Sequence, residues 1–168
     1  MDVSETLTFR NAQRYGFKLA ATVVGQMITY AQHELALKEA GGILLGRYIL
    51  DSNDVVVDEV TVPTPGDVRT RVNFVRAKRG HQESADQAWS NSRGTRHYLG
   101  EWHTHPEPVP KPSQVDLMNW KRLLAYYRND PDPLYFVIVG TEAICAWQGH
   151  KTGVIEVLTL SYTGEGEL

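Results

Sequence analysis

The sequence predicts a mixed α/β (α+β) fold, in which helices pack against one mixed sheet. Apolar residues recur at helical spacing between Thr22 and Glu39, which predicts an amphipathic helix. Strand patterns follow at residues 43–50 and 55–62, and three strand patterns in succession close the chain. No internal repeat or second domain is visible. Because helices are interspersed with strands, the order of elements indicates a single sheet that carries the helices.

The first half of the chain has clear boundaries between these elements. The helix pattern places five apolar side chains on one face: Val24, Met27, Ile28, Ala31 and Leu35. The Gly41-Gly42 pair interrupts that pattern, and the strand at residues 43–50 has the composition of a buried strand. The segment 63–80 is rich in proline, glycine and charged residues, so we expect a loop or a short irregular strand there.

The second half continues the mixed order. We expect a short helix at residues 83–92, a strand at 97–105 and a proline-rich loop, PEPVPKP, that ends at Ser113. A longer helix should run from there to about Asn129, with one apolar face formed by Leu117, Trp120, Leu124 and Tyr127. The last strands are expected at residues 134–139, 143–148 and 154–161. The terminal residues GEGEL are predicted to be frayed.

Length and composition are those of one folded domain. The chain has 168 residues, so we treat residues 1–168 as a single domain with its core at about 22–161. Apolar residues make up 42% and charged residues 22%, which argues against disorder. The net charge of −3 favours neither a nucleic-acid nor a membrane partner. No apolar run approaches the roughly 20 residues that cross a bilayer, and the start lacks a secretion-signal pattern.

Cys145 is the single cysteine of the chain. One thiol cannot form an intramolecular disulfide, and it cannot build a structural zinc site from several thiolates. We therefore expect a soluble protein of the reducing cytoplasm.

A possible metal site lies in the segment GEWHTHPEPVPKPSQVD. Side chains alternate faces along a strand, so His103 and His105 should point the same way, about 7 Å apart along the chain. Asp116, on the first turn of the following helix, can supply a third ligand. Two imidazoles and one carboxylate suit zinc and leave a position open for water, as a catalytic site requires.

Each of these features also has a simpler explanation. An H-x-H pair in a strand is more often structural than metal-binding. The S-x-x-D spacing of Ser113 and Asp116 is that of a helix capping box. The two explanations are compatible, because a capped and rigid helix start is a good support for a ligand.

Two glutamates are candidates for a general base. If the first helix continues to its end, Glu39 lies about 40° around from Leu35 and leans toward the apolar face. It then takes a proton from the attacking water, although a frayed helix end would leave it in solvent. Glu101 shares the strand face of both histidines, so it could be the base, orient an imidazole from behind, or form a structural salt bridge.

These residues together resemble the JAMM motif of the JAB/MPN metalloproteases. The match comprises EAGGILLG from Glu39 to Gly46, then HTHP from His103, and then Ser113 and Asp116 at the expected spacing. The resemblance implies a mixed, mostly antiparallel, curved sheet flanked by helices. It also implies one Zn²⁺ per chain on His103, His105 and Asp116. Glu39 would be the base, and Ser113 would steady the tetrahedral intermediate or the metal-bound water.

More narrowly, GGILLGRY and GEWHTHPEPVPKPS resemble small bacterial members found in anti-phage CBASS operons. The resemblance implies a deubiquitinase-like isopeptidase that removes a CD-NTase-like or ubiquitin-like protein, conjugated through an extended C-terminal tail, from its target. One departure concerns the pair Glu101-Trp102, where many eukaryotic members have glycine-tryptophan and then an aromatic residue before the first histidine. It affects the inferred substrate and leaves the ligands unchanged.

Two alternatives remain open. The first is a protease that trims the C-terminus of a ubiquitin-like sulfur-carrier protein, which would share this site and differ in substrate. The second is a metal-free MPN-type scaffold, which would bind partner proteins without cleaving them. Possible substrate contacts are Arg69, Arg71, Phe74 and Trp102, although a basic loop is more often solvated and a tryptophan in a strand is more often core. Aromatic interleaving limited to Phe74 argues against nucleic acid.

Overall fold

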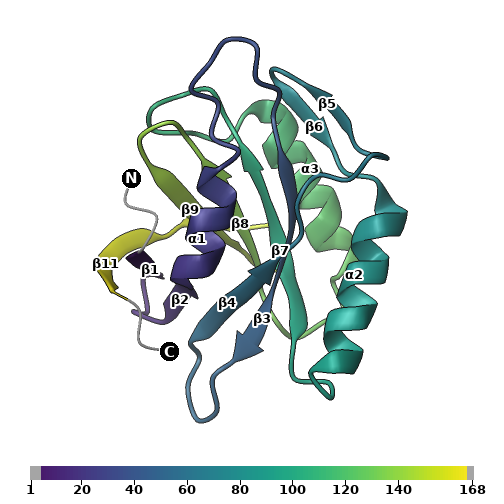
Figure 1. Ribbon diagram of the computed structural model, residues 1–168. Helices are drawn as coiled ribbons and strands as arrows, with labels where there is room; N and C mark the ends of the chain where they lie inside the picture. Colours follow the sequence, from purple (N-terminus) through teal and green to yellow (C-terminus); the bar gives the residue numbers. More distant parts are fainter. Residues whose placement is uncertain (1–4, 166–168) are drawn as a thin grey trace.

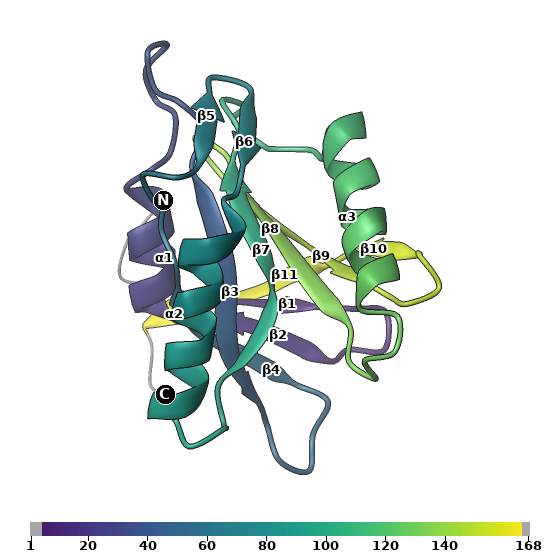
Figure 2. The same cartoon turned by 90° about the vertical axis from the view of Figure 1, so that its right-hand side faces the viewer.

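The computed structural model describes residues 5–165 and contains one large sheet, a small hairpin and three helices (Figures 1 and 2). The strands of the large sheet are β1 (Glu5–Arg10), β2 (Gly16–Leu19), β3 (Gly41–Tyr48), β4 (Val55–Val60), β7 (His97–Thr104), β8 (Leu134–Val139), β9 (Ile144–Gly149), β10 (Ile155–Val157) and β11 (Thr159–Glu165). The hairpin consists of β5 (Val68–Thr70) and β6 (Asn73–Val75). The helices are α1 (Ala21–Ile28), α2 (Lys78–Asn91) and α3 (Gln114–Tyr126).

The large sheet is mixed, mostly antiparallel and strongly curved. Its strand order is β10-β9-β8-β7-β3-β4-β2-β1-β11, and β2·β4 and β7·β8 are its parallel pairs. β10 and β11 lie at opposite ends of this order, yet only Leu158 separates them in the chain. The sheet must therefore curl until its two edges approach each other. The predicted fold class is confirmed.

The helices cover different parts of this curved sheet. Figure 2 shows α2 and α3 on opposite sides of the central strands. The buried face of α1, formed by Val23, Val24 and Met27, belongs to the largest core cluster. The predicted apolar face of α3 packs on β8 and β9, where Trp120 stacks on Phe136 with ring centroids 4.5 Å apart.

The first helix is much shorter than predicted. The helix expected at residues 22–39 ends at Ile28, and the chain then runs to β3 without regular structure. The apolar repeat was misleading because its last member, Leu35, is 83% exposed. Gln32, in contrast, is buried. Its polar side chain bonds to neighbouring segments, which an uninterrupted helix would not allow.

Other elements also differ from the prediction. β1 and β2 precede Thr22, where the core was expected to begin, and they carry buried residues of the main core. The segment 63–80 contains the β5–β6 hairpin, and α2 begins five residues before the predicted start at residue 83. The strand expected at 154–161 is divided at Leu158, where the chain passes from β9 to β1.

The predicted frayed tail, residues 164–168, begins inside β11, and its last three residues lie outside the described range. Over residues 5–165, no helix combines the length and the apolar character needed to cross a membrane.

Candidate metal centre

Two imidazoles project from the end of the central strand β7. His103 lies between Gly41 of β3 and Ile138 of β8, so neighbouring strands hold its backbone on both sides. His105 follows the strand, and its N–H donates to the carbonyl of Val139. Thr104, between the histidines, points to the opposite face and is fully buried. The central position of β7 thus fixes the direction of both rings.

Asp116 reaches the same point from the first turn of α3. Ser113 is the N-cap of this helix, and its hydroxyl accepts a hydrogen bond from the N–H of Asp116 at 3.2 Å. In return, the N–H of Ser113 donates to Oδ2 of Asp116 at 2.6 Å. The capping box expected from the sequence is therefore present, and it orients the carboxylate.

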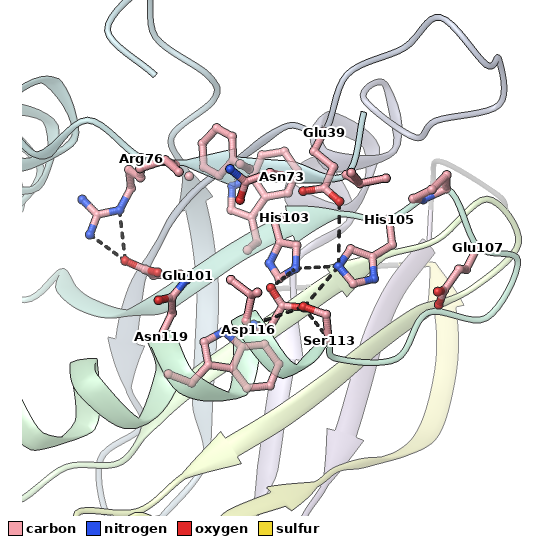
Figure 3. A pocket seen from close by; sticks show the side chains of 18 residues that line it. Glu39, Asn73, Arg76, Glu101, His103, His105, Glu107, Ser113, Asp116 and Asn119 are labelled. Carbon is pink, nitrogen blue, oxygen red and sulfur yellow. Dashed lines mark hydrogen bonds and ion pairs between the residues drawn. The ribbon is translucent and has the colours of Figure 1, made fainter. Parts of the chain in front are cut away.

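The potential ligand atoms of these three residues converge (Figure 3). The two Nε2 atoms lie 3.0 Å apart. Oδ1 of Asp116 lies 3.3 Å from Nε2 of His103, and Oδ2 lies 3.3 Å from Nε2 of His105. Ligands at about 2.0–2.1 Å from a tetrahedral zinc ion are about 3.3 Å from one another. The donor set and its spacing thus fit zinc.

Hydrogen bonds and charges within the cluster shift the pKa values of Asp116 and His105. Burial alone would raise the pKa of Asp116, but hydrogen bonds from His103, His105 and Ser113 hold it well below its usual range. Burial also disfavours a charged His105. Hydrogen bonding and the charges of Asp116 and Glu39 outweigh that effect and raise its pKa.

Glu39 lies beside this cluster, but on a loop. It stands two residues before β3, in the irregular segment after α1, so its predicted position on a helix is wrong. Its side chain is buried, and Oε1 lies 4.0 Å from Nε2 of His105. Burial raises the pKa of Glu39 to about 7; the charge of Asp116 adds to this shift and that of His105 opposes it. A carboxyl group with a pKa near neutrality can take up and release a proton.

Glu101 lies on the same face of β7 but is held by a salt bridge. Its Oε1 accepts from Nε and Nη2 of Arg76, at 3.0 and 2.6 Å. Both side chains are about three-quarters buried. Of the three roles considered for Glu101, the structural salt bridge is the one with a matching contact.

The four predicted substrate contacts occupy different environments. Arg69 donates to the carbonyl of Glu39 at 2.6 Å, and Arg71 donates to the carbonyls of Glu34 and Leu35. Both arginines therefore bind the loop backbone. Trp102 is a core residue, 1% exposed, whose indole N–H donates to Thr61 O. These three side chains already have protein partners.

Phe74 differs, because it is partly exposed in a groove at the candidate metal centre, which Trp102 also lines although it is buried. The groove has a volume of about 800 Å³ and lies between β6, the end of β7 and the start of α3. β6 pairs only with β5 among the described strands, so its other edge is unpaired. Asn73 and Asn119 also line the groove and were missed in the sequence. Asn119 could have been found, since it follows Asp116 by three residues on the same helix face.

Comparisons with known proteins agree with this geometry. Residues 20–150 match the family model described as prokaryotic homologs of the JAB domain. A Pseudomonas aeruginosa protein named CD-NTase/cGAS isopeptidase is 44% identical over 119 residues, which cover 69% of this chain and 73% of that protein. A Vibrio cholerae protein of the same name is 34% identical over 129 residues, covering 77% and 78%.

A solved structure has a similar fold. It is protein DSY2949 from Desulfitobacterium hafniense, with a TM-score of 0.57 and 22% identity over 85% of this chain and 88% of that chain. At this identity the likeness concerns the fold alone. The match to the family model covers most of the chain, and the convergence of His103, His105 and Asp116 is consistent with it. The chain belongs to the JAB domain family, among its prokaryotic members.

Proposed function

We propose that this protein is a zinc-dependent isopeptidase of the JAMM type, which releases a C-terminally conjugated protein from its target. The observation that carries the proposal is the convergence of His103, His105 and Asp116, with Glu39 buried beside them. In the proposal these three side chains hold one Zn²⁺ per chain. When bound, zinc supplies Lewis-acid chemistry, which acidifies a water molecule and polarises a carbonyl.

Glu39 is the proposed general base. Its carboxylate takes a proton from the attacking water and then delivers it to the leaving amine, so that the group returns to its starting state. In the metal-free protein the pKa of Glu39 is about 7, which supports a role in proton transfer near neutral pH. The 4.0 Å between Glu39 Oε1 and His105 Nε2 supports this role, because the carboxyl group lies beside the proposed ligands.

Ser113 is the proposed donor to the oxyanion. Its Oγ accepts from the backbone of Asp116, which orients a side chain that lines the groove. An acceptor role toward the backbone leaves the hydroxyl proton for another partner. A fixed donor at this point would stabilise the negative charge that develops on the scissile carbonyl.

The proposed substrate is a protein with an extended C-terminal tail, either CD-NTase-like or ubiquitin-like. Two relatives carry the name CD-NTase/cGAS isopeptidase, which supports an isopeptide conjugate and a role in CBASS anti-phage defence. The unpaired edge of β6 lines the groove, and an extended tail can bind to such an edge through its backbone. Phe74 is the aromatic contact proposed for that tail.

The test uses the purified protein loaded with zinc. One substrate is a CD-NTase whose C-terminal carboxyl group is joined to the ε-amino group of a lysine, and the other is a ubiquitin-like sulfur-carrier protein with a C-terminal extension. We expect cleavage of the first at the isopeptide bond. Faster trimming of the carrier protein would show that the sulfur carrier, and not the CD-NTase conjugate, is the preferred substrate. If the protein binds no zinc and cleaves neither substrate, it is a scaffold.

A further inference from the structure

Gln32 is a buried polar residue that joins three segments around the candidate site. It lies in the irregular stretch after α1 and is 2% exposed. Its amide nitrogen donates to the carbonyls of Leu37 and Arg71, at 3.1 and 2.9 Å. Its Oε1 accepts from the hydroxyl of Thr104 at 3.1 Å. Both hydrogens of the amide are thereby used, and the three partners lie on the Glu39 loop, the β5–β6 hairpin and β7.

Thr104 extends this network to the residue after Glu39. It lies between the two histidines, and its side chain points away from them into the core. While its hydroxyl donates to Gln32, its Oγ1 accepts from the N–H of Ala40 at 2.9 Å. The N–H of Thr104 in turn donates to the carbonyl of Ala40 at 2.8 Å. Both backbone hydrogen bonds of Ala40 are therefore made with Thr104, the residue between the two histidines.

The hairpin holds Glu39 from the other side. The N–H of Glu39 donates to the carbonyl of Thr70 at 2.8 Å, and its own carbonyl accepts from Nε of Arg69 at 2.6 Å. Gln32 binds the next residue of the hairpin, Arg71, through its carbonyl. The backbone around Glu39 is thus fixed between the hairpin and β7, and Gln32 contacts both supports.

We infer that Gln32 is a positioning residue, which sets the place of the Glu39 carboxyl group relative to the two imidazoles. The inference rests on the proposed function, since it assigns Gln32 an effect on the reaction that Glu39 assists. Without this amide, Leu37 O, Arg71 O and the Thr104 hydroxyl lose a buried partner. The loop then relaxes and Glu39 moves. A misplacement of about 1 Å in a catalytic group costs on the order of 10²-fold in rate.

The experiment replaces Gln32 by a residue of similar shape with no hydrogen-bonding amide. For Gln32→Met, we expect kcat on the CD-NTase–lysine conjugate to fall by about 10- to 100-fold, with KM within about twofold and zinc content unchanged. Gln148→Met is the matched control. Gln148 lies on β9 and is 6% exposed, and its Oε1 accepts from the side-chain amide of Asn11. It does not line the groove of the candidate metal ligands, so its loss should lower Tm and leave kcat unchanged.

A pair of substitutions at Thr104 tests the same network more gently. Thr104→Ser keeps the hydroxyl and should retain kcat, whereas Thr104→Val keeps the shape, loses the hydroxyl and should reproduce the Gln32→Met defect. If Gln32→Met proves insoluble, this pair decides the question. Equal kcat for both Thr104 variants, or a rise in KM with kcat unchanged, would overturn the inference. Failure of the wild-type protein to bind zinc or to need Glu39 would instead reject the proposed function.

Discussion

Oε1 of Glu39 and Nε2 of His105 lie 4.0 Å apart, although 66 positions separate the two residues in the chain (105 − 39). Glu39 comes from an irregular loop, and His105 follows the central strand (Figure 3). Burial raises the pKa of Glu39 to about 7, so this carboxyl group changes between its protonated and ionised forms near neutral pH. The predictions for Glu39 follow from this arrangement.

Replacing Glu39 should separate metal binding from cleavage. In Glu39→Gln the three proposed ligands are untouched, so we expect zinc to remain at one per chain. The amide cannot accept the proton, and kcat should fall by about 10²- to 10⁴-fold. Zinc analysis and conjugate cleavage measure the two effects. Glu83→Gln, at an exposed position on α2, is the control and should behave as wild type. Near-full activity of Glu39→Gln would show that another group is the base.

The same substitution should stabilise the metal-free protein at higher pH. Below its ordinary pKa of 4.5, Glu39 is protonated in both the folded and the unfolded chain. Above about 7 it is ionised in both, and only the folded state carries a buried charge. The free energy of unfolding of the wild type, relative to Glu39→Gln, should therefore fall by about 3 kcal/mol between these two values. Urea unfolding with a chelator at both ends of this window measures the difference, and an equal difference at both ends would contradict the raised pKa.

The spacing of apolar residues predicted those helices and strands in which the apolar positions are the buried ones. The α3 face with Trp120 and Leu124, and the strand at 134–139, appear as expected because nearest neighbours along the chain decide them. Two strands before Thr22 were missed, since their pairing with β4 and β11 depends on residues far away in the chain. The first helix was overextended because Leu35 fits the helical period but is exposed.

The candidate site was predictable where spacing determines geometry. His103 and His105 share a strand face, and Asp116 sits at a helix start, so their convergence follows from short-range rules. Glu39 became a candidate base through a helix that does not extend that far, and the family motif favoured it over Glu101. Gln32 carries no signal in the sequence, because its partners Leu37, Arg71 and Thr104 are brought together only by the tertiary fold.

Removing one imidazole should abolish metal binding. In His105→Ala, one of three proposed protein ligands is lost, and we expect zinc content to fall well below one per chain and cleavage to cease. His150→Ala is the matched control, because His150 lies in the turn before β10 and contacts Glu156. The control should retain zinc and activity. Stoichiometric zinc in His105→Ala would mean that the ion binds elsewhere.

Glu101 should affect stability more than chemistry. Glu101→Ala leaves the guanidinium of Arg76 without its partner, at a cost of about 1–3 kcal/mol in the free energy of unfolding. Because the Glu101 carboxylate is bound to Arg76, the kcat of Glu101→Ala should stay within about tenfold of wild type. Glu39→Ala should lose about 10²-fold or more in kcat. Thermal unfolding and cleavage rates of the two variants make the comparison. A larger loss of kcat in Glu101→Ala would exchange the roles of the two glutamates.

Ser113 has a structural role at the start of α3 and a proposed role in catalysis, and two substitutions separate them. Ser113→Gly removes the hydroxyl but costs the helix start only a few tenths of a kcal/mol, because glycine is itself a tolerated N-cap; Ser113→Ala costs about 1 kcal/mol. If the hydroxyl donates to the oxyanion, both variants should lose about 10²- to 10³-fold in kcat despite their different stability. If Ser113 only caps the helix, Ser113→Gly should keep nearly full activity while Ser113→Ala loses Tm. Cleavage rates measured together with thermal unfolding therefore distinguish a donor from a cap.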